Sequence, residues 1–210
     1  MILRTSIIIQ IVLVSITFTL LGQYDVRTSI IHGKKYKGFL DETGFHLLNQ
    51  KNETILNIKG SFFSLDFRDF NKDGYKDIFL DPGGNTPECF DLFLFVPPTG
   101  KFKQVKDFGF FPAPEQINKT KYYYSYHKNG CADLAWVSDL FYIKNFVAIR
   151  IGSISGDGCG VKDGINIYKV KAGEKILFKT LPINTIKKYK EYKWGFIREY
   201  WNNNFRAFFK

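Results

Sequence analysis

The sequence predicts an antiparallel all-β fold, built as a sandwich or a propeller-like array of short hairpins. The 210 residues include 22 Phe and 12 Tyr but a single Met, and this bias towards aromatic residues favours sheets. Short apolar segments alternate with turn residues at intervals typical of consecutive strands. A chain of this length can bury a sizeable core in one domain. We therefore expect a single β domain that spans residues 23–210.

Pairs of apolar runs predict β-hairpins, because the Gly, Pro, Asn and Asp residues between the runs suit tight turns. The expected strand pairs are 35–40 with 45–48, 61–67 with 78–80, 90–96 with 102–105, 132–143 with 146–155, and 165–170 with 175–181. A further strand is expected at 122–126.

The C-terminal segment, residues 195–210, allows two interpretations. It can form a basic amphipathic helix, or a last hairpin of strands 196–200 and 205–209. Three consecutive Asn residues at 202–204 are poor in a helix but suit a tight turn with positive φ. We therefore expect the hairpin.

The stretch from Asp69 to Asp77 places oxygen-bearing side chains at alternate positions, followed at once by Gly74. Calcium takes roughly 6–8 oxygen ligands at about 2.3–2.6 Å, from carboxylates, amide oxygens and backbone carbonyls. A loop around the ion needs a sharp bend, which glycine makes without steric cost. The expected ligands are the side chains of Asp69, Asn71, Asp73 and Asp77 and the backbone carbonyl of Tyr75.

The residues on either side decide which kind of calcium loop this is. Residues 61–67 and 78–80 are short, aromatic and apolar, as strands are, and lack the helical spacing of an EF-hand. The position where an EF-hand carries its bidentate Glu is Leu80. The loop resembles the FG-GAP/VCBS calcium motif of secreted and cell-surface β proteins, which implies one structural Ca²⁺ ion. An Asx-rich turn without metal remains the alternative.

The first 22 residues, 1–22, have the pattern of a secretory signal peptide. Arg4 supplies the positive charge, residues 7–21 supply an apolar stretch, and Gly22 is a small residue at a plausible cleavage point. The alternative is a membrane anchor, but the apolar stretch is shorter than the ~20 residues of a spanning helix and contains polar side chains. We expect a secreted or periplasmic protein, with no transmembrane segment after signal removal.

Three cysteines would lie in that oxidising compartment, so one is left over when a disulfide forms. In the hairpin expected to turn at 144–145, the register that best pairs apolar residues also places Cys131 opposite Cys159. We therefore predict a disulfide between Cys131 and Cys159 and a free, buried Cys89. No cysteines have the C-x-x-C spacing of a metal site.

The chain carries a formal net charge of +10, and its Lys and Arg residues are mostly scattered. Such a surface favours anionic partners. Secretion makes nucleic acid the least suitable of these, so we expect a protein partner or an anionic cell-envelope polymer and no nucleic acid. A basic surface that serves solubility is the alternative.

Sequence motifs of catalysis are missing. His32, His46 and His127 fit no zinc pattern, and there is neither a G-x-S-x-G elbow nor a phosphate-binding glycine loop. The adjacent Asp41 and Glu42 are weak evidence for glycoside hydrolysis. The carboxylates of the acidic loop would be used by the ion. We therefore expect a protein that is not an enzyme.

Aromatic and basic side chains suggest two weaker possibilities. Trp136, Trp194 and Trp201 can stack on sugars, although packing in a core is the default for aromatic residues of a β protein. The basic, aromatic stretch 187–201 can contact an anionic membrane surface, although a strand with solvated lysines is the simpler interpretation.

The order of features across residues 61–126 extends the resemblance. A strand enters the acidic loop, another strand follows at 90–95, and Pro98-Thr99-Gly100-Lys101-Phe102 comes next. This order is similar to that of secreted or periplasmic β-propeller-like proteins with one calcium loop. Some of those proteins are immunity-type inhibitors of lysozyme-like toxins passed between Gram-negative bacteria. The resemblance implies a binding protein, and it identifies no inhibitory residue here.

Two functions from different classes are therefore considered. The first is a secreted or periplasmic, calcium-stabilised binding protein that inhibits lysozyme-like enzymes by filling their cleft. The alternative is a cell-envelope glycan-binding protein or hydrolase that uses the tryptophans and scattered carboxylates.

Overall fold

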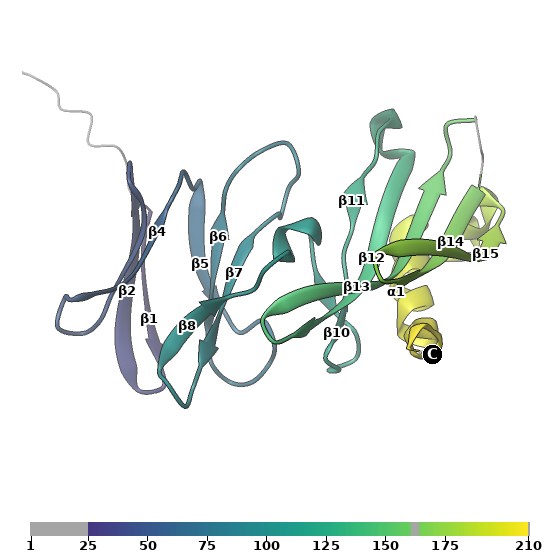
Figure 1. Cartoon of the computed structure of the whole chain (residues 1–210). Helices are drawn as coiled ribbons and strands as arrows, with labels where there is room; N and C mark the ends of the chain where they lie inside the picture. The colour runs from purple at the N-terminus through teal and green to yellow at the C-terminus, as the bar shows by residue number, and fades with distance from the viewer. Residues whose placement is uncertain (1–24, 161–163, 210) are drawn as a thin grey trace, which may run out of the picture.

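The computed structural model describes residues 25–160 and 164–209 and contains three antiparallel sheets, arranged one after another along the molecule (Figure 1). The ladders between named strands are antiparallel, which confirms the predicted all-β class. Within the described ranges no sheet closes into a barrel. The predicted signal peptide, residues 1–22, lies outside the described residues.

The first two sheets are four-stranded meanders, in which each strand pairs with the next one along the chain. The first sheet contains β1 (Val26–Ile31), β2 (Lys34–Asp41), β3 (Gly44–Leu48) and β4 (Thr54–Lys59). The second contains β5 (Ser64–Arg68), β6 (Asp77–Asp81), β7 (Asp91–Val96) and β8 (Lys101–Gln104). The hairpins predicted in this half of the chain are therefore present, together with β1 and β4, which were not predicted.

The third sheet has the strand order β15-β14-β13-β12-β10-β9, and the short β11 also pairs with β12. Its strands are β9 (Glu115–Gln116), β10 (Tyr122–Tyr124), β11 (His127–Lys128), β12 (Ala135–Lys144), β13 (Val147–Asp157), β14 (Gly164–Lys171) and β15 (Glu174–Leu181). Both hairpins predicted for this region are confirmed.

Helical segments connect and follow the strands. The 3₁₀ helices are η1 (Phe108–Phe110), η2 (Cys131–Asp133), η3 (Ile183–Lys188) and η4 (Phe205–Phe208), and the α-helix α1 spans Lys193–Asn204. In the part of the chain that the structure describes, no helix is long and apolar enough to cross a membrane.

Buried side chains form three clusters, one between each pair of neighbouring layers. The first cluster joins the first and second sheets, the next joins the second and third sheets, and the last joins the third sheet to α1. Strand β6 shows why the second sheet is covered on both faces. Ile78 and Leu80 belong to the first cluster, whereas Phe79 between them belongs to the next, as the alternation of a strand requires.

The predicted C-terminal hairpin of strands 196–200 and 205–209 is wrong, because this segment forms α1 and η4 against the third sheet (Figure 1). Phe196, Ile197 and Trp201 are buried, and their spacing places them on one face of a helix. The indole Nε1 of Trp201 donates a hydrogen bond to Ser138 Oγ on β12 at 2.8 Å. Tertiary burial therefore outweighs the poor helix propensity of the Asn residues.

Two of the three Asn side chains form hydrogen bonds within the helix, so the Asn run at 202–204 is compatible with helical structure. Asn202 Nδ2 donates to the carbonyl of Arg198, and Asn204 Nδ2 donates to the carbonyl of Tyr200, each at 2.8 Å. Local bonds of this kind often favour turns, but these two span one helical turn and leave the helix intact.

The β12–β13 hairpin turns one residue later than predicted. Asn145 and Phe146 occupy the turn with positive φ, and Lys144 pairs with Val147. A register shift at Leu140 then offsets the rest of the ladder, so the predicted register is wrong. The disulfide predicted from that register nevertheless forms, because both cysteines lie beyond Ala135 and Asp157, the last paired residues of the hairpin.

Candidate metal centre and adjoining groove

The predicted metal loop connects β5 to β6, and Arg68 and Asp77 at its two ends form the last pair of that ladder. Lys72 and Gly74 both have positive φ, 61° and 92°, and these two positions produce the tight bend of the loop. A Cβ at Gly74 would meet nothing within 4 Å. Glycine is therefore favoured there by the backbone angle rather than by lack of space.

Inside the loop, side-chain oxygens accept hydrogen bonds from backbone N–H groups. The Asp69 carboxylate accepts from the N–H groups of Asp73 and Gly74 at 3.2 and 3.1 Å. Asp73 Oδ1 accepts from Tyr75 N–H at 2.9 Å, and Asn71 Nδ2 donates to Asp73 Oδ2 at 2.8 Å. The predicted ligands from 69 to 75 are therefore brought together in one tight bend.

Asp77 is fully buried at the base of the loop and binds two different segments. Its two carboxylate oxygens accept the N–H groups of Phe70 at 3.0 Å and of Phe95, on β7, at 2.9 Å. Burial raises the pKa of Asp77 to about 7, the two backbone hydrogen bonds oppose that rise, and the charges of Asp73 and Asp69 add to it. Asp77 thus links the loop to the second sheet.

The donor chemistry of this loop fits a hard cation. Three Asp and one Asn lie in this loop or at its base, and carboxylate and amide oxygens are the ligand types that calcium accepts. In the described residues, however, no three His, Cys, Asp or Glu side chains form a group that could hold a metal ion. Calcium binding therefore stays a prediction.

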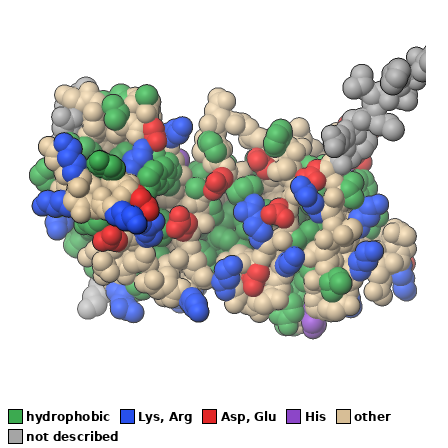
Figure 2. Space-filling view, turned by 180° about the vertical axis from the view of Figure 1, so that it is seen from behind, with side chains coloured by type: hydrophobic (Ala, Val, Ile, Leu, Met, Phe, Trp, Pro, Cys, Tyr) green, Lys and Arg blue, Asp and Glu red, His purple; other side chains and the backbone are tan. Residues whose placement is uncertain are grey.

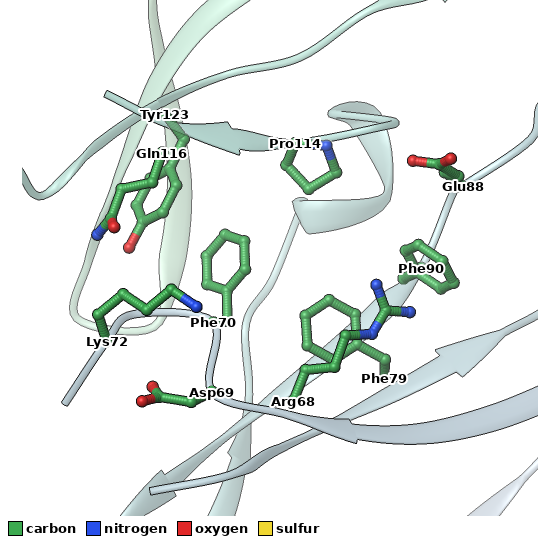
Figure 3. Close-up of a pocket in the computed structure, with 10 residues that line it drawn as sticks. All are labelled: Arg68, Asp69, Phe70, Lys72, Phe79, Glu88, Phe90, Pro114, Gln116 and Tyr123. Atoms are coloured by element: carbon green, nitrogen blue, oxygen red, sulfur yellow. The ribbon is translucent and has the colours of Figure 1, made fainter. Parts of the chain in front are cut away.

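Beside the loop, a groove of about 420 Å³ lies between the second and third sheets (Figure 3). Arg68 and Lys72 come from the second-sheet side, and Gln116 and Tyr123 from the third-sheet side. Phe70, which the loop presents to the third sheet, stacks on Tyr123 with ring centroids 4.5 Å apart. The loop therefore forms part of the groove wall.

The groove carries both signs of charge, Arg68 and Lys72 against Asp69 and Glu88, whereas the hollow beside it is basic. A neighbouring hollow of about 650 Å³ shares Lys72 and Tyr123 with the groove and adds Lys119 and Lys121. The guanidinium of Arg68 lies 4.4 Å from the ring centroid of Phe79, so apolar rings hold this cation in place. Elsewhere the Lys and Arg side chains are scattered among acidic ones, as Figure 2 shows for one face.

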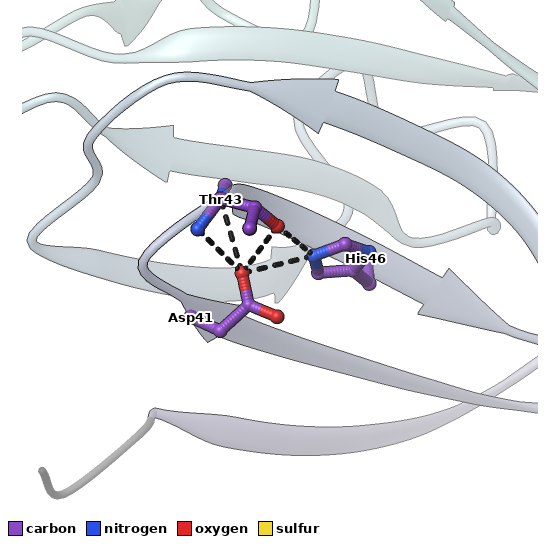
Figure 4. A network of polar contacts seen from close by, with 4 residues as sticks. Asp41, Thr43 and His46 are labelled. Carbon is purple, nitrogen blue, oxygen red and sulfur yellow. Dashed lines mark hydrogen bonds and ion pairs between the residues drawn. The ribbon is translucent and has the colours of Figure 1, made fainter.

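A polar network at the β2–β3 turn contains an Asp, a Thr and a His (Figure 4). Asp41 Oδ1 accepts from the N–H of Thr43 at 2.8 Å and from its hydroxyl at 2.7 Å, and lies 3.0 Å from His46 Nε2. The Thr43 hydrogen bond lowers the pKa of Asp41 to about 2. A single nitrogen of His46 contacts both partners, whereas a relay triad uses both ring nitrogens. The network therefore stabilises the turn.

The predicted disulfide is present between Cys131 and Cys159, whose Cα atoms lie 6.3 Å apart. Cys89 is the free cysteine of the described residues, as predicted, although it is half-buried rather than fully buried. Its Sγ donates to the carbonyl of Gly109 at 2.9 Å, and burial raises the pKa of the thiol, so it is a weak nucleophile.

The three tryptophans have different environments. Trp136 and Trp201 are 1% and 0% exposed and pack in the third cluster, whereas Trp194 at the start of α1 is 45% exposed. Packing is therefore the role of two of them, and Trp194 is the one available for contact with a ligand.

Comparison with known proteins identifies a similar fold. No family model and no curated protein sequence matches the chain. A solved structure described as that of a Xanthomonas type IV secretion system related protein is similar, with a TM-score of 0.51 and 14% sequence identity. The similarity covers 76% of this chain and 95% of that chain. At this identity the match supports a shared fold and gives no residue roles.

Proposed function

We propose that this chain is an exported, non-enzymatic protein that calcium stabilises and that inhibits a lysozyme-like enzyme. The observation that carries the proposal is the acidic loop 69–77, which contains several oxygen donors and forms one wall of a groove beside a lysine-lined hollow. The relation of the structural neighbour to type IV secretion supports a role connected with secretion. The stacked four-stranded sheets also favour the propeller-like form of the fold.

The proposed ion would be held by the loop and would act structurally. Asp69, Asn71, Asp73 and Asp77 would supply side-chain oxygens, and Tyr75 would supply its carbonyl. The positive charge of the ion would offset the burial of the Asp77 carboxylate, which is the main cause of its raised pKa, and also the repulsion from Asp73 and Asp69, which adds to it. Binding would fix the loop and, through Phe70 and Tyr123, the adjoining groove.

An exported location is supported by the cysteines. Disulfides persist in oxidising compartments and are rare in the cytosol, and Cys131 and Cys159 form one here. The predicted signal peptide at 1–22 has the same implication. Calcium is also abundant enough outside cells to fill weak sites of this kind.

Inhibition would work by occlusion. Glycoside hydrolases of the lysozyme type place a pair of Asp or Glu side chains in their cleft. The cations of the groove and the hollow beside it, Arg68, Lys72, Lys119 and Lys121, are complementary in charge to such a cleft. A rigid groove edge that carries these cations would cover the catalytic carboxylates and exclude the glycan.

The test measures peptidoglycan hydrolysis by a panel of lysozyme-type enzymes, with the protein added in calcium and in chelator. We expect inhibition in calcium, and we expect Lys72→Ala with Lys121→Ala to weaken it about thirtyfold, since each removed contact between opposite charges contributes on the order of 1 kcal/mol. Lys59→Ala on β4 is the matched control, because this lysine is exposed on the first sheet, away from the groove.

Two outcomes would contradict the proposal. One is inhibition of none of the enzymes in the panel. The other is glycan hydrolysis by this protein itself that a single carboxylate substitution abolishes, which would favour the hydrolase alternative.

A further inference from the structure

A second pocket, of about 390 Å³, lies between the β6–β7 loop, the segment before β9, strand β11 and the start of α1. Its volume is within the roughly 300–1,000 Å³ range of small-molecule sites. The lining residues that matter here are Asn85, Glu88, Glu115, Tyr126, His127 and Trp194. Neither the calcium loop nor the cations of the groove line this pocket.

Two aromatic rings form one wall of the pocket. Trp194 and Tyr126 have ring centroids 4.0 Å apart, and both line the pocket. Lys193 and Asp133 hold them in position: the ammonium of Lys193 lies 5.2 Å from the Trp194 ring and pairs with Asp133 at 2.6 Å. The Tyr126 hydroxyl also donates to Asp133. The exposed indole is therefore fixed before any ligand arrives.

Polar groups without protein partners face the same space. The side chains of Glu88 and Asn85 make no hydrogen bond or ion pair within the described residues. The ring of His127 also lines the pocket, although its Nδ1 is buried and not open to it. Glu115 accepts one hydrogen bond, from the hydroxyl of Tyr124. Asn85, Glu88 and Glu115 are exposed, so their amide and carboxylate groups are available to a ligand with several hydroxyl or amide groups.

The balance of charge and ring surface narrows the class of ligand. The lining contains the carboxylates of Glu88 and Glu115 and the side chain of Lys128, so both signs of charge are present. Burial lowers the pKa of His127, and its neutral ring both donates and accepts. A sugar ring presents weakly positive C–H groups on its face, which suit the negative face of an indole, and hydroxyls on its edge.

We propose that this pocket binds an uncharged sugar unit of a glycan, with its ring face on Trp194 and its hydroxyls on Glu115, Glu88 and His127. An isolated exposed tryptophan needs no functional explanation. Here, however, a fixed indole, two carboxylates and the His127 ring line one concave site. This binding goes beyond the proposed inhibition, and its pocket adjoins the groove through Glu88, which lines both.

The test is a titration of the full mature chain with three tetrasaccharides, the β-1,4-linked N-acetylglucosamine tetramer, cellotetraose and maltotetraose. Tryptophan fluorescence and calorimetry provide the two readouts. Because Trp136 and Trp201 are buried, a ligand-dependent shift of the emission would come from Trp194. We expect saturable binding of at least one tetrasaccharide, and a loss of about tenfold or more in Trp194→Ala, as removal of a stacking ring implies.

Glu115→Gln is the second variant, because it keeps the shape of the side chain while removing its charge, and it should weaken binding several-fold. Phe63→Ala is the matched control for an exposed aromatic residue, since Phe63 is 81% exposed and lies outside the pocket. Absence of saturable binding to all three sugars would overturn the proposal, as would equal affinity of the native chain and Trp194→Ala. If the Trp194→Ala variant still inhibits lysozyme-type enzymes and the Lys72→Ala variant still binds the sugar, the pocket and the groove act independently. Failure of one proposal is then distinguishable from failure of the other.

Discussion

The acidic loop 69–77 and helix α1 are both packed against the sheets, but different forces hold them. In the loop, carboxylate oxygens accept backbone N–H groups, and a single buried residue, Asp77, attaches the loop to β7. In α1, apolar side chains such as Phe196 and Trp201 are buried in the third cluster. The loop is thus held mainly by hydrogen bonds to its carboxylates, with Phe70 as its packed side chain, and the helix mainly by burial.

This difference implies different sensitivities. A loop held by carboxylates responds to ions, because bound cations relieve the repulsion between its charges. A helix held by buried rings responds to the loss of shape and volume, because a cavity in a packed core is not refilled. The predictions that follow separate these two responses.

The largest expected effect is in the helix. Trp201→Ala removes a fully buried indole and leaves Ser138 Oγ without its hydrogen-bond donor. We expect the free energy of unfolding to fall by about 3–5 kcal/mol, measured by denaturant titration. Addition of calcium or chelator should leave this loss unchanged, because the loop and α1 contact different clusters.

Trp194→Ala is the matched control on the same helix. Its indole is 45% exposed, so its removal should cost less than about 1 kcal/mol. Equal costs for the two substitutions would mean that burial against the third sheet does not hold α1.

The next effect is in the loop and depends on the proposed ion. If free calcium exceeds its dissociation constant about 100-fold, binding adds about 2.7 kcal/mol to the free energy of unfolding. Chelation should therefore lower the melting temperature. Asp73→Ala should abolish that response, because it removes a proposed ligand and the acceptor for Tyr75 N–H. The measurement is a pair of thermal melts, in calcium and in chelator.

Glu174→Ala is the control for removal of an exposed carboxylate, since Glu174 lies on β15, far from the loop in the chain. It should keep the calcium response. A melting temperature that chelator does not change in the native chain would refute the structural ion and leave the Asx-rich turn as the explanation of the loop.

The same contrast explains which parts of the fold the sequence reveals. Turn residues and alternating apolar residues act locally, so the β2–β3, β5–β6 and β7–β8 hairpins follow from the sequence. The helical conformation around Phe196 and Trp201 depends on packing against the third sheet, whose strands are distant in the sequence. Local propensity at 202–204 favoured a turn, and burial against the third sheet overrode it.

The candidate sites show the same limit. The loop is visible in the sequence because its donors lie within nine consecutive residues, 69–77. The pocket at Trp194 joins residues from the β6–β7 loop to α1, and no spacing rule connects them. The sequence suggested Trp194 as one of three candidate sugar contacts, but only the fold distinguishes it from the two buried tryptophans.

The smallest expected effect compares the same substitution, Asn→Ala, in the two regions. In α1, Asn202 donates one bond to the Arg198 carbonyl, but its buried Oδ1 has no partner in the described residues. Alanine removes that unsatisfied oxygen and has the highest helix propensity, so Asn202→Ala should raise stability by about 0.5–1 kcal/mol in either buffer. Asn71→Ala should instead lose the calcium response, because its amide oxygen is a proposed ligand. Denaturant titrations of both variants in calcium and in chelator measure this contrast, and a calcium-dependent effect of Asn202→Ala would show that the loop and the helix are coupled.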